Sequence, residues 1–213
     1  MSYSIHLSIS ATTGDIDGVA FAIKDGADVN QENGEALQKA IQGDDTRMVQ
    51  TLIALGANVN QQHERWGIPL ARAAERGNVE IVSYLLDHGA TEYDQAVDKA
   101  TRSNRLAVLQ ALKRRGVDTT PTTEAITAAM QVKGAATILY HMADGHELTE
   151  QQVLTAIYLD VRQVIDHLTT NSDYLPSQEL YDSLMGSSFE WFLQAIAQRE
   201  LNKTLRKFML PKH

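Results

Sequence analysis

A motif recurs along the first half of the chain at a fixed spacing. Its clearest copy is Pro69–Ala90, in which a short helical pattern of small residues is followed by a glycine, an apolar block and a Gly-Ala pair. The preceding copy keeps the same offsets, because Leu37 and Gly56 are 19 positions apart, as are Leu70 and Gly89. A unit this short cannot bury its apolar face alone. The pattern therefore predicts helix pairs that stack on one another.

These units resemble the ankyrin repeats. The resemblance rests on the start of the helix at Pro69-Leu70, on the Gly-Ala-Asp-Val-Asn run at Gly26–Asn30 and on its near-copy at Gly56–Asn60. The chain departs from the family at Ile68 and Ala71, where ankyrin repeats usually have the Thr and His of a Thr-Pro-Leu-His turn. The match is specific up to about residue 90, and beyond that it rests on spacing alone.

The resemblance implies an all-α fold, an ankyrin-type α-solenoid of six to seven helix-turn-helix units with short hairpin loops and a divergent C-terminal helical cap. We expect ankyrin-like repeats over residues 1–146 and divergent repeats with the helical cap over residues 147–213. The ankyrin-like units are placed at about residues 5–30, 31–60, 61–91, 92–118 and 119–146.

Local signals place several helix ends. Pro69 suits the first position of a helix, and Thr149 with Gln152 predicts a capping box. Ser177 is expected to cap a later helix, and Asp160 takes the place of a turn glycine. A final amphipathic helix is expected from Glu200 to Leu210, separate from the aromatic unit before it.

Composition limits the possible functions. The formal net charge of −8 disfavours nucleic acid as a partner, because phosphate binding needs clustered Lys and Arg. The chain has no cysteine, which excludes disulfides and thiolate zinc sites. We see no secretory signal and no apolar run that could span a membrane, and we expect a cytoplasmic protein that is monomeric alone.

One basic band interrupts the acidic sequence. Its members are Lys99, Arg102, Arg105, Lys113, Arg114 and Arg115. A solvated helix face is the simpler interpretation of this band.

No catalytic, cofactor or metal site is predicted, and no small-molecule substrate. The nearest metal motif is His146-Glu147-Leu148-Thr149-Glu150, but a zinc hydrolase needs a second His where Glu150 stands. We interpret His141, Asp144 and His146 as loop residues after a helix rather than as ligands. Nothing orders Ser and His into a nucleophile and base.

The resemblance to ankyrin repeats implies that hairpin fingers and the ends of inner helices line a concave groove that binds a protein. The finger candidates are Glu32, Asn33, Glu35, His63, Glu64, Arg65 and Trp66. The inner-helix candidates are Gln42, Glu75, Arg76, Arg102, Gln131 and Tyr158.

Two aromatic residues leave alternatives open. Trp66 follows a hydrophilic stretch, so it is either folded back into the core or an exposed anchor of the kind that often dominates interfaces. Tyr158 belongs either to a binding surface or to packing against the C-terminal helices.

The leading interpretation is a non-enzymatic protein-protein interaction module, that is, an adaptor, scaffold or effector. The alternative is an acidic inhibitor or decoy. It would block a basic enzyme, including one that processes nucleic acids, by presenting carboxylates in place of phosphates.

Overall fold

The computed structural model describes the backbone of residues 2–209 and the side chains of residues 6–204, and its regular secondary structure there is entirely helical. Fourteen helices are formed in this range, and the expected all-α fold is confirmed. The chain divides into two compact units, Met1–Ala125 and Ile126–His213, and the division falls inside one helix, α9 (Thr123–Gln131).

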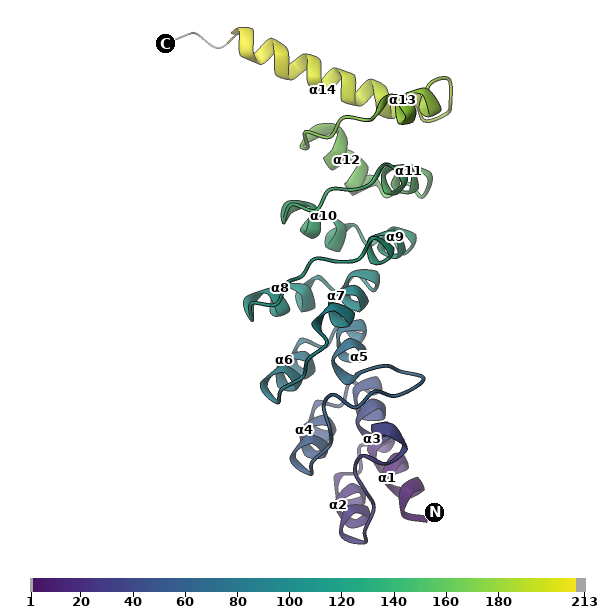
Figure 1. Cartoon of the computed structure of the whole chain (residues 1–213), viewed down its shortest axis with the longest axis vertical. Coiled ribbons are helices and arrows are strands. Elements are labelled where there is room, and N and C mark those ends of the chain that lie inside the picture. Colours follow the sequence, from purple (N-terminus) through teal and green to yellow (C-terminus); the bar gives the residue numbers. More distant parts are fainter. Residues whose placement is uncertain (1, 210–213) are drawn as a thin grey trace. The chain divides into compact units, whose positions relative to one another are not determined.

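The first unit contains eight helices in two rows (Figure 1). The inner row is α1 (Ser2–Thr13), α3 (Gln31–Gln42), α5 (Pro69–Arg76) and α7 (Tyr93–Arg102). The outer row is α2 (Ile16–Lys24), α4 (Thr46–Ala54), α6 (Val79–Asp87) and α8 (Leu106–Arg114). Each inner helix packs against the outer helix that follows it and against its neighbours in the inner row. This is the expected stack of helix pairs.

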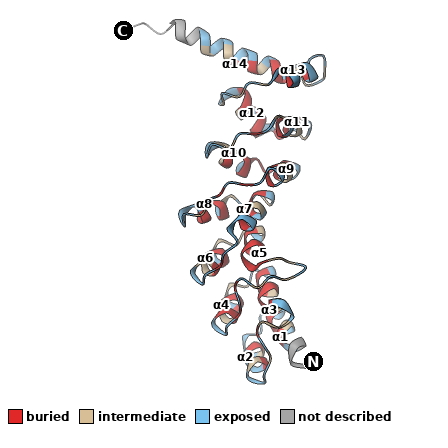
Figure 2. Cartoon of the chain, viewed as in Figure 1, coloured by how far each residue is buried: buried red, intermediate tan, exposed pale blue. Residues whose placement is uncertain are grey.

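The core of the first unit lies between its two rows (Figure 2). Leu37 and Leu70 of the inner helices and Leu52 and Leu85 of the outer helices are fully buried, at the repeating positions that the sequence predicts. Burying a leucine side chain contributes about 2 kcal/mol. The amphipathic faces of the helices therefore supply most of the stability of the stack.

The turn within each helix pair uses one residue with left-handed backbone. Gly14, Gly77 and Gly186 occupy this position in three turns, whereas Asp44, Asn104, Lys133 and Asp160 occupy it elsewhere, with φ between 51° and 54°. Asp160 thus stands where a turn glycine was expected. Left-handed backbone is sterically unfavourable for residues other than glycine. It is less unfavourable for Asn and Asp, because their short side chains can form local hydrogen bonds.

Side chains also connect successive loops of the first unit. Asn30 donates from Nδ2 to the carbonyl oxygen of Gly56 at 3.0 Å. Asn60, which ends the next copy of the same run, donates to the carbonyl oxygen of Gly89 at 2.9 Å and accepts from the N–H of Thr91 at 2.9 Å. These bonds hold neighbouring repeats together although the Thr-Pro-Leu-His turn is incomplete.

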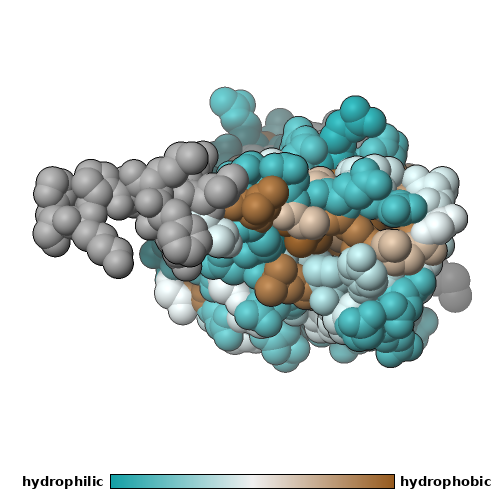
Figure 3. Space-filling view, turned by 90° about the horizontal axis from the view of Figure 1, so that it is seen from above, coloured by the Kyte–Doolittle hydropathy of each residue, from teal (hydrophilic) through white to brown (hydrophobic). Residues whose placement is uncertain are grey.

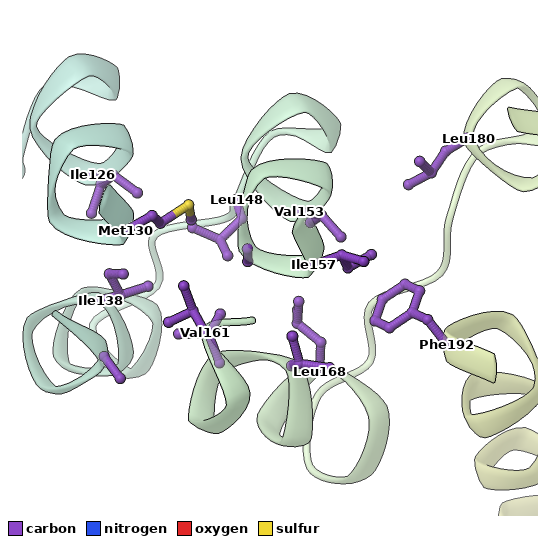
Figure 4. Close-up of a cluster of buried hydrophobic side chains, with 14 of the residues drawn as sticks. Ile126, Met130, Ile138, Leu148, Val153, Ile157, Val161, Leu168, Leu180 and Phe192 are labelled. Carbon is purple, nitrogen blue, oxygen red and sulfur yellow. The ribbon is translucent and has the colours of Figure 1, made fainter. Parts of the chain in front are cut away.

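The second unit continues the alternation of helices. After α9 come α10 (Ala135–Ala143), α11 (Glu150–Tyr158), α12 (Arg162–Thr170), α13 (Gln178–Leu184) and α14 (Glu190–Met209). The capping box of Thr149 and Gln152 is present, and Ser177 caps α13, as expected. A single apolar cluster joins these helices, and Figure 4 shows Met130, Val161 and Phe192 pointing into it.

The final helix differs from the expectation. Glu190–Met209 is one continuous helix, so the separate helix expected from Glu200 to Leu210 is wrong, and Leu210 itself lies outside the described residues. The reason is local: no glycine or proline occurs between Glu190 and Met209, and most residues there are good helix formers.

Several apolar side chains in and near α13 and α14 are exposed, among them Tyr181, Met185 and Trp191. Seen from above, the surface carries apolar side chains among hydrophilic ones (Figure 3). Among the described residues, no helix combines the length and the apolar character needed to cross a membrane.

Candidate functional site

A long hairpin finger connects α4 and α5. His63 and Gly67 close it by two backbone hydrogen bonds, from the N–H of His63 to the oxygen of Gly67 at 3.0 Å and the reverse at 2.9 Å. Glu64 and Arg65 lie exposed at its tip. Gln38 of α3 donates from Nε2 to the carbonyl oxygen of Gly67 at 2.9 Å, which fixes the finger to the inner row.

Trp66 lies on the returning side of this finger and is half-buried. Its ring stacks on the imidazole of His63, with centroids 4.2 Å apart and planes inclined by 26°. Nζ of Lys39 lies 5.1 Å from the Trp66 centroid, and the guanidinium carbons of Arg65 and Arg72 lie at 6.0 Å. We call these five residues the Trp66 cluster. Trp66 is thus neither a core residue nor a free anchor.

Sequence reasoning missed two members of this cluster, Lys39 of α3 and Arg72 of α5. A signal was present, because these residues are 33 positions apart, as are Leu37 and Leu70. The repeat therefore places two basic side chains at the same position of adjacent inner helices. Each of the two lies over the ring of Trp66.

Two of the candidate binding residues take part in ion pairs between repeats. Glu75 accepts from Nζ of Lys99 at 3.1 Å, and its other oxygen lies 3.5 Å from Nη1 of Arg72. Arg76 donates to Oδ2 of Asp44 at 2.9 Å. The Glu75–Lys99 and Arg76–Asp44 pairs are partly exposed, so each contributes at most about 1 kcal/mol to stability. A partner can compete for these side chains.

The remaining candidates in the first unit lie at its surface. Glu32, Asn33, Gln42 and Arg102 are exposed, and Glu35 is half-buried at the start of α3. Glu32 and Asn33 both have left-handed backbone, which bends the chain within the first turn of α3.

In the second unit, Gln131 is exposed at the end of α9. Tyr158 is 67% exposed at the end of α11. Its ring packs edge-to-face with the ring of Phe189, with centroids 4.8 Å apart. Tyr158 therefore both contacts the segment before α14 and presents most of its surface to solvent.

Part of the basic band is paired with acidic or backbone oxygens of the preceding repeat. Nη1 of Arg115 donates to Asp87 at 2.6 Å, and this bond lowers the pKa of Asp87. Nε of Arg105 donates to the carbonyl oxygen of Glu75 at 3.0 Å. Together with the contact of Lys99 with Glu75, these bonds give the band a structural role in joining repeats.

The metal motif considered from the sequence is split by a helix boundary. His146 lies in the loop after α10, whereas α11 begins at Glu150, so the two residues do not share a helix face. The interpretation of His141 as a loop residue is wrong, because His141 lies within α10 and is buried. Among the described residues, no group of three or more His, Asp or Glu side chains could hold a metal ion.

Comparison with known proteins matches the central part of the chain. A family model for Ankyrin repeats (3 copies) covers residues 37–123, which include the long finger and the Trp66 cluster. The 2-5A-dependent ribonuclease of Mus musculus is 39% identical over 71 residues, 33% of this chain and 10% of that protein. The RelA-associated inhibitor of Mus musculus is 40% identical over 84 residues, 38% of this chain and 10% of that protein.

A third relative is the Ankyrin repeat and KH domain-containing protein mask-1 of Caenorhabditis elegans. It is 41% identical over 71 residues, 32% of this chain and 3% of that protein. This chain spans a tenth or less of the length of these three relatives. The paired helices agree with the matched family. By the helix pairs and by this match, residues 37–123 of the chain consist of ankyrin repeats.

Proposed function

We propose that this chain is a non-catalytic module that binds a protein partner through its hairpin fingers and the ends of its inner helices. The observation that carries the proposal is the Trp66 cluster. An aromatic ring on a fixed finger, with an exposed Arg beside it, has the composition of an interface hot spot. The other candidate residues of the first unit extend this surface along its inner row.

The outer helices are not expected to contact the partner. Their apolar sides are buried against the inner row, and their outer sides are polar, as with Arg47 of α4 and Gln110 of α8. Binding should therefore depend on the finger rather than on these positions.

Site-specific photo-crosslinking tests the proposal. A photoreactive amino acid at Glu64, at the tip of the finger, should give one discrete crosslinked protein in a cell extract. The same amino acid at Gln110 is the matched control, since Gln110 is also exposed but lies on an outer helix. Equal labelling at both positions, or labelling at Gln110 alone, would contradict the proposed surface.

A second candidate is the inhibitory mode, in which capture of the partner blocks its activity. The observation that favours it is the similarity to a protein named RelA-associated inhibitor. The version in which carboxylates replace phosphates needs an acidic contact surface, whereas the Trp66 cluster is basic. Adding the chain to the crosslinked partner should reduce that partner's activity if this mode operates, and should leave it unchanged if the chain is an adaptor.

A further inference from the structure

The Trp66 cluster is a local positive site on a chain whose net charge is −8. Lys39 and Arg65 form no ion pair with any carboxylate in the described part of the chain. Arg72 has only the 3.5 Å contact with Glu75, and that carboxylate also accepts from Lys99. The three cations thus exceed the acidic groups that contact them.

The ring of Trp66 holds these cations in place. Lys39, Arg65 and Arg72 come from α3, the finger and α5, and each lies within 6.0 Å of the ring centroid. A cation over an aromatic face is attracted by about 0.5–1 kcal/mol at a partly exposed site. Side chains that are ordered before binding lose less entropy when a ligand arrives.

His63 stacks on the same ring at 4.2 Å, so the aromatic surface is largely taken up within the cluster. What the site offers a ligand is therefore a set of N–H donors rather than a free ring. Arg binds carboxylates through two parallel hydrogen bonds, which suits this arrangement.

The spacing of the cations indicates the size of the ligand. Groups at 5.1 Å and 6.0 Å from one centroid are at most about 12 Å apart. An extended peptide advances about 3.3 Å per residue and places alternate side chains on one side. About five residues, with acidic side chains at the first, third and fifth positions, span about 13 Å and would reach all three cations.

We infer that the Trp66 cluster binds a short acidic segment of the partner protein, with the carboxylates accepting hydrogen bonds from Lys39, Arg65 and Arg72. This inference rests on the proposed protein-binding function and adds the chemistry of the partner. A nucleic acid fits less well, because three cations neutralise few phosphates.

Panning of a random 12-residue peptide library on the wild-type chain tests the inference. The selected peptides should contain at least twice the Asp and Glu content of the input library. A selected peptide should bind at least tenfold more weakly when its acids are replaced by amides, and at least fivefold more weakly at 300 mM than at 50 mM NaCl.

The double variant Lys39→Gln/Arg65→Gln should weaken binding of that peptide at least tenfold. The matched control is Arg47→Gln/Arg114→Gln, which removes the same charge from the outer helices α4 and α8. Thermal unfolding of both variants establishes that they are folded. Equal weakening by both pairs, selected peptides no more acidic than the input, or tighter binding of a 12-nucleotide single strand would overturn the inference.

The outcomes separate this inference from the proposed function. If Glu64 crosslinks a partner but the selected peptides are neutral, the module binds protein and the acidic chemistry is wrong. If neither crosslinking nor panning identifies the finger, the proposed function fails as well.

Discussion

The side-chain oxygen of Asn30 accepts a hydrogen bond of 2.7 Å from the backbone N–H of Asn58, one repeat further along the chain. The amide nitrogen of the same Asn30 side chain donates to the carbonyl oxygen of Gly56. One side chain thus satisfies a donor and an acceptor of the following loop. Asn60 makes the same pair of contacts with Thr91 and Gly89.

Replacing Asn30 with Ala should lower the free energy of unfolding by about 1 kcal/mol, because two partly solvated backbone groups lose their partner. The double variant Asn30→Ala/Asn60→Ala should lose about 2 kcal/mol, since the two junctions are separate. Urea unfolding followed by circular dichroism measures both values. Gln62→Ala, an exposed position, is the control and should change stability by less than about 0.5 kcal/mol. A loss no larger than this control would contradict the bridging role.

Trp66→Ala should weaken binding of the crosslinked partner by at least ~2 kcal/mol while lowering stability by only about 1 kcal/mol, because the ring is half-buried. Titration calorimetry and thermal unfolding provide the two numbers. Trp191→Ala is the matched control, since Trp191 is 45% exposed but lies in the second unit. A stability loss of about 3 kcal/mol or more would instead make Trp66 a core residue.

Gly77 and Gly89 offer a comparison of two glycines with similar backbone. Their φ angles are 89° and 83°, but a Cβ at Gly77 would lie 2.8 Å from Cδ of Arg105, whereas Gly89 has no atom within 4 Å. Gly89→Ala should cost about 1 kcal/mol, the usual cost of left-handed backbone. Gly77→Ala should cost about 2 kcal/mol, because Arg105 must also release the carbonyl oxygen of Glu75.

Chemical unfolding of Gly77→Ala in an Arg105→Ala background checks the cause. The extra cost should disappear there, leaving a value like that of Gly89→Ala. If the cost at Gly77 persists without the Arg105 side chain, the close approach is not its origin.

Arg199 of α14 is 7% exposed and donates to the carbonyl oxygens of Leu168 and Tyr174. Arg199→Met keeps an apolar stem but leaves these oxygens without their charged donor. The variant should lose about 3 kcal/mol of stability, as measured by urea unfolding.

Arg162→Met is the control for this prediction, because Arg162 is 77% exposed and its removal should cost less than about 0.5 kcal/mol. Arg199→Lys should fall between the two, since an ammonium group can reach one carbonyl but not both. Equal stability of Arg199→Met and Arg162→Met would show that the bonds of Arg199 do not hold α14.

Lys203 contacts Asp173 at 2.6 Å and Glu200 at 3.1 Å. Its hydrogen bonds lower the pKa of both carboxyl groups, and the bond to Asp173 raises the pKa of Lys203. A lowered carboxyl pKa gives stability that is present above the unfolded-state pKa and is lost as pH falls through the folded-state value. The raised lysine pKa gives stability that is present below its unfolded value and is lost as pH rises through the folded one.

Carbon-detected NMR titration tests this arrangement. In Lys203→Met the pKa of Asp173 should rise toward the ordinary aspartate value, whereas Lys133→Met, at an exposed position elsewhere in the unit, should leave it unchanged. An unchanged Asp173 titration in Lys203→Met would show that the ion pair is not formed in solution.

The sequence by itself determined the helix pairs and most of their ends. The 19-residue spacings from Leu37 to Gly56 and from Leu70 to Gly89 reflect the period of the buried face. Pro69 and the capping residues Thr149 and Ser177 act locally, through backbone geometry. It also indicated the finger and Trp66, because an aromatic residue in a polar loop breaks the pattern around it.

Only the tertiary structure decided what surrounds Trp66. Lys39 is 27 positions earlier in the chain, and it reaches the ring because stacking brings α3 beside the finger. The pairing of Arg76 with Asp44 and of Arg199 with Leu168 has the same origin. Such contacts depend on the packing of one helix on the next and on side-chain rotamers. Neither is written in the local sequence, because the same repeat pattern allows many side-chain arrangements at its surface.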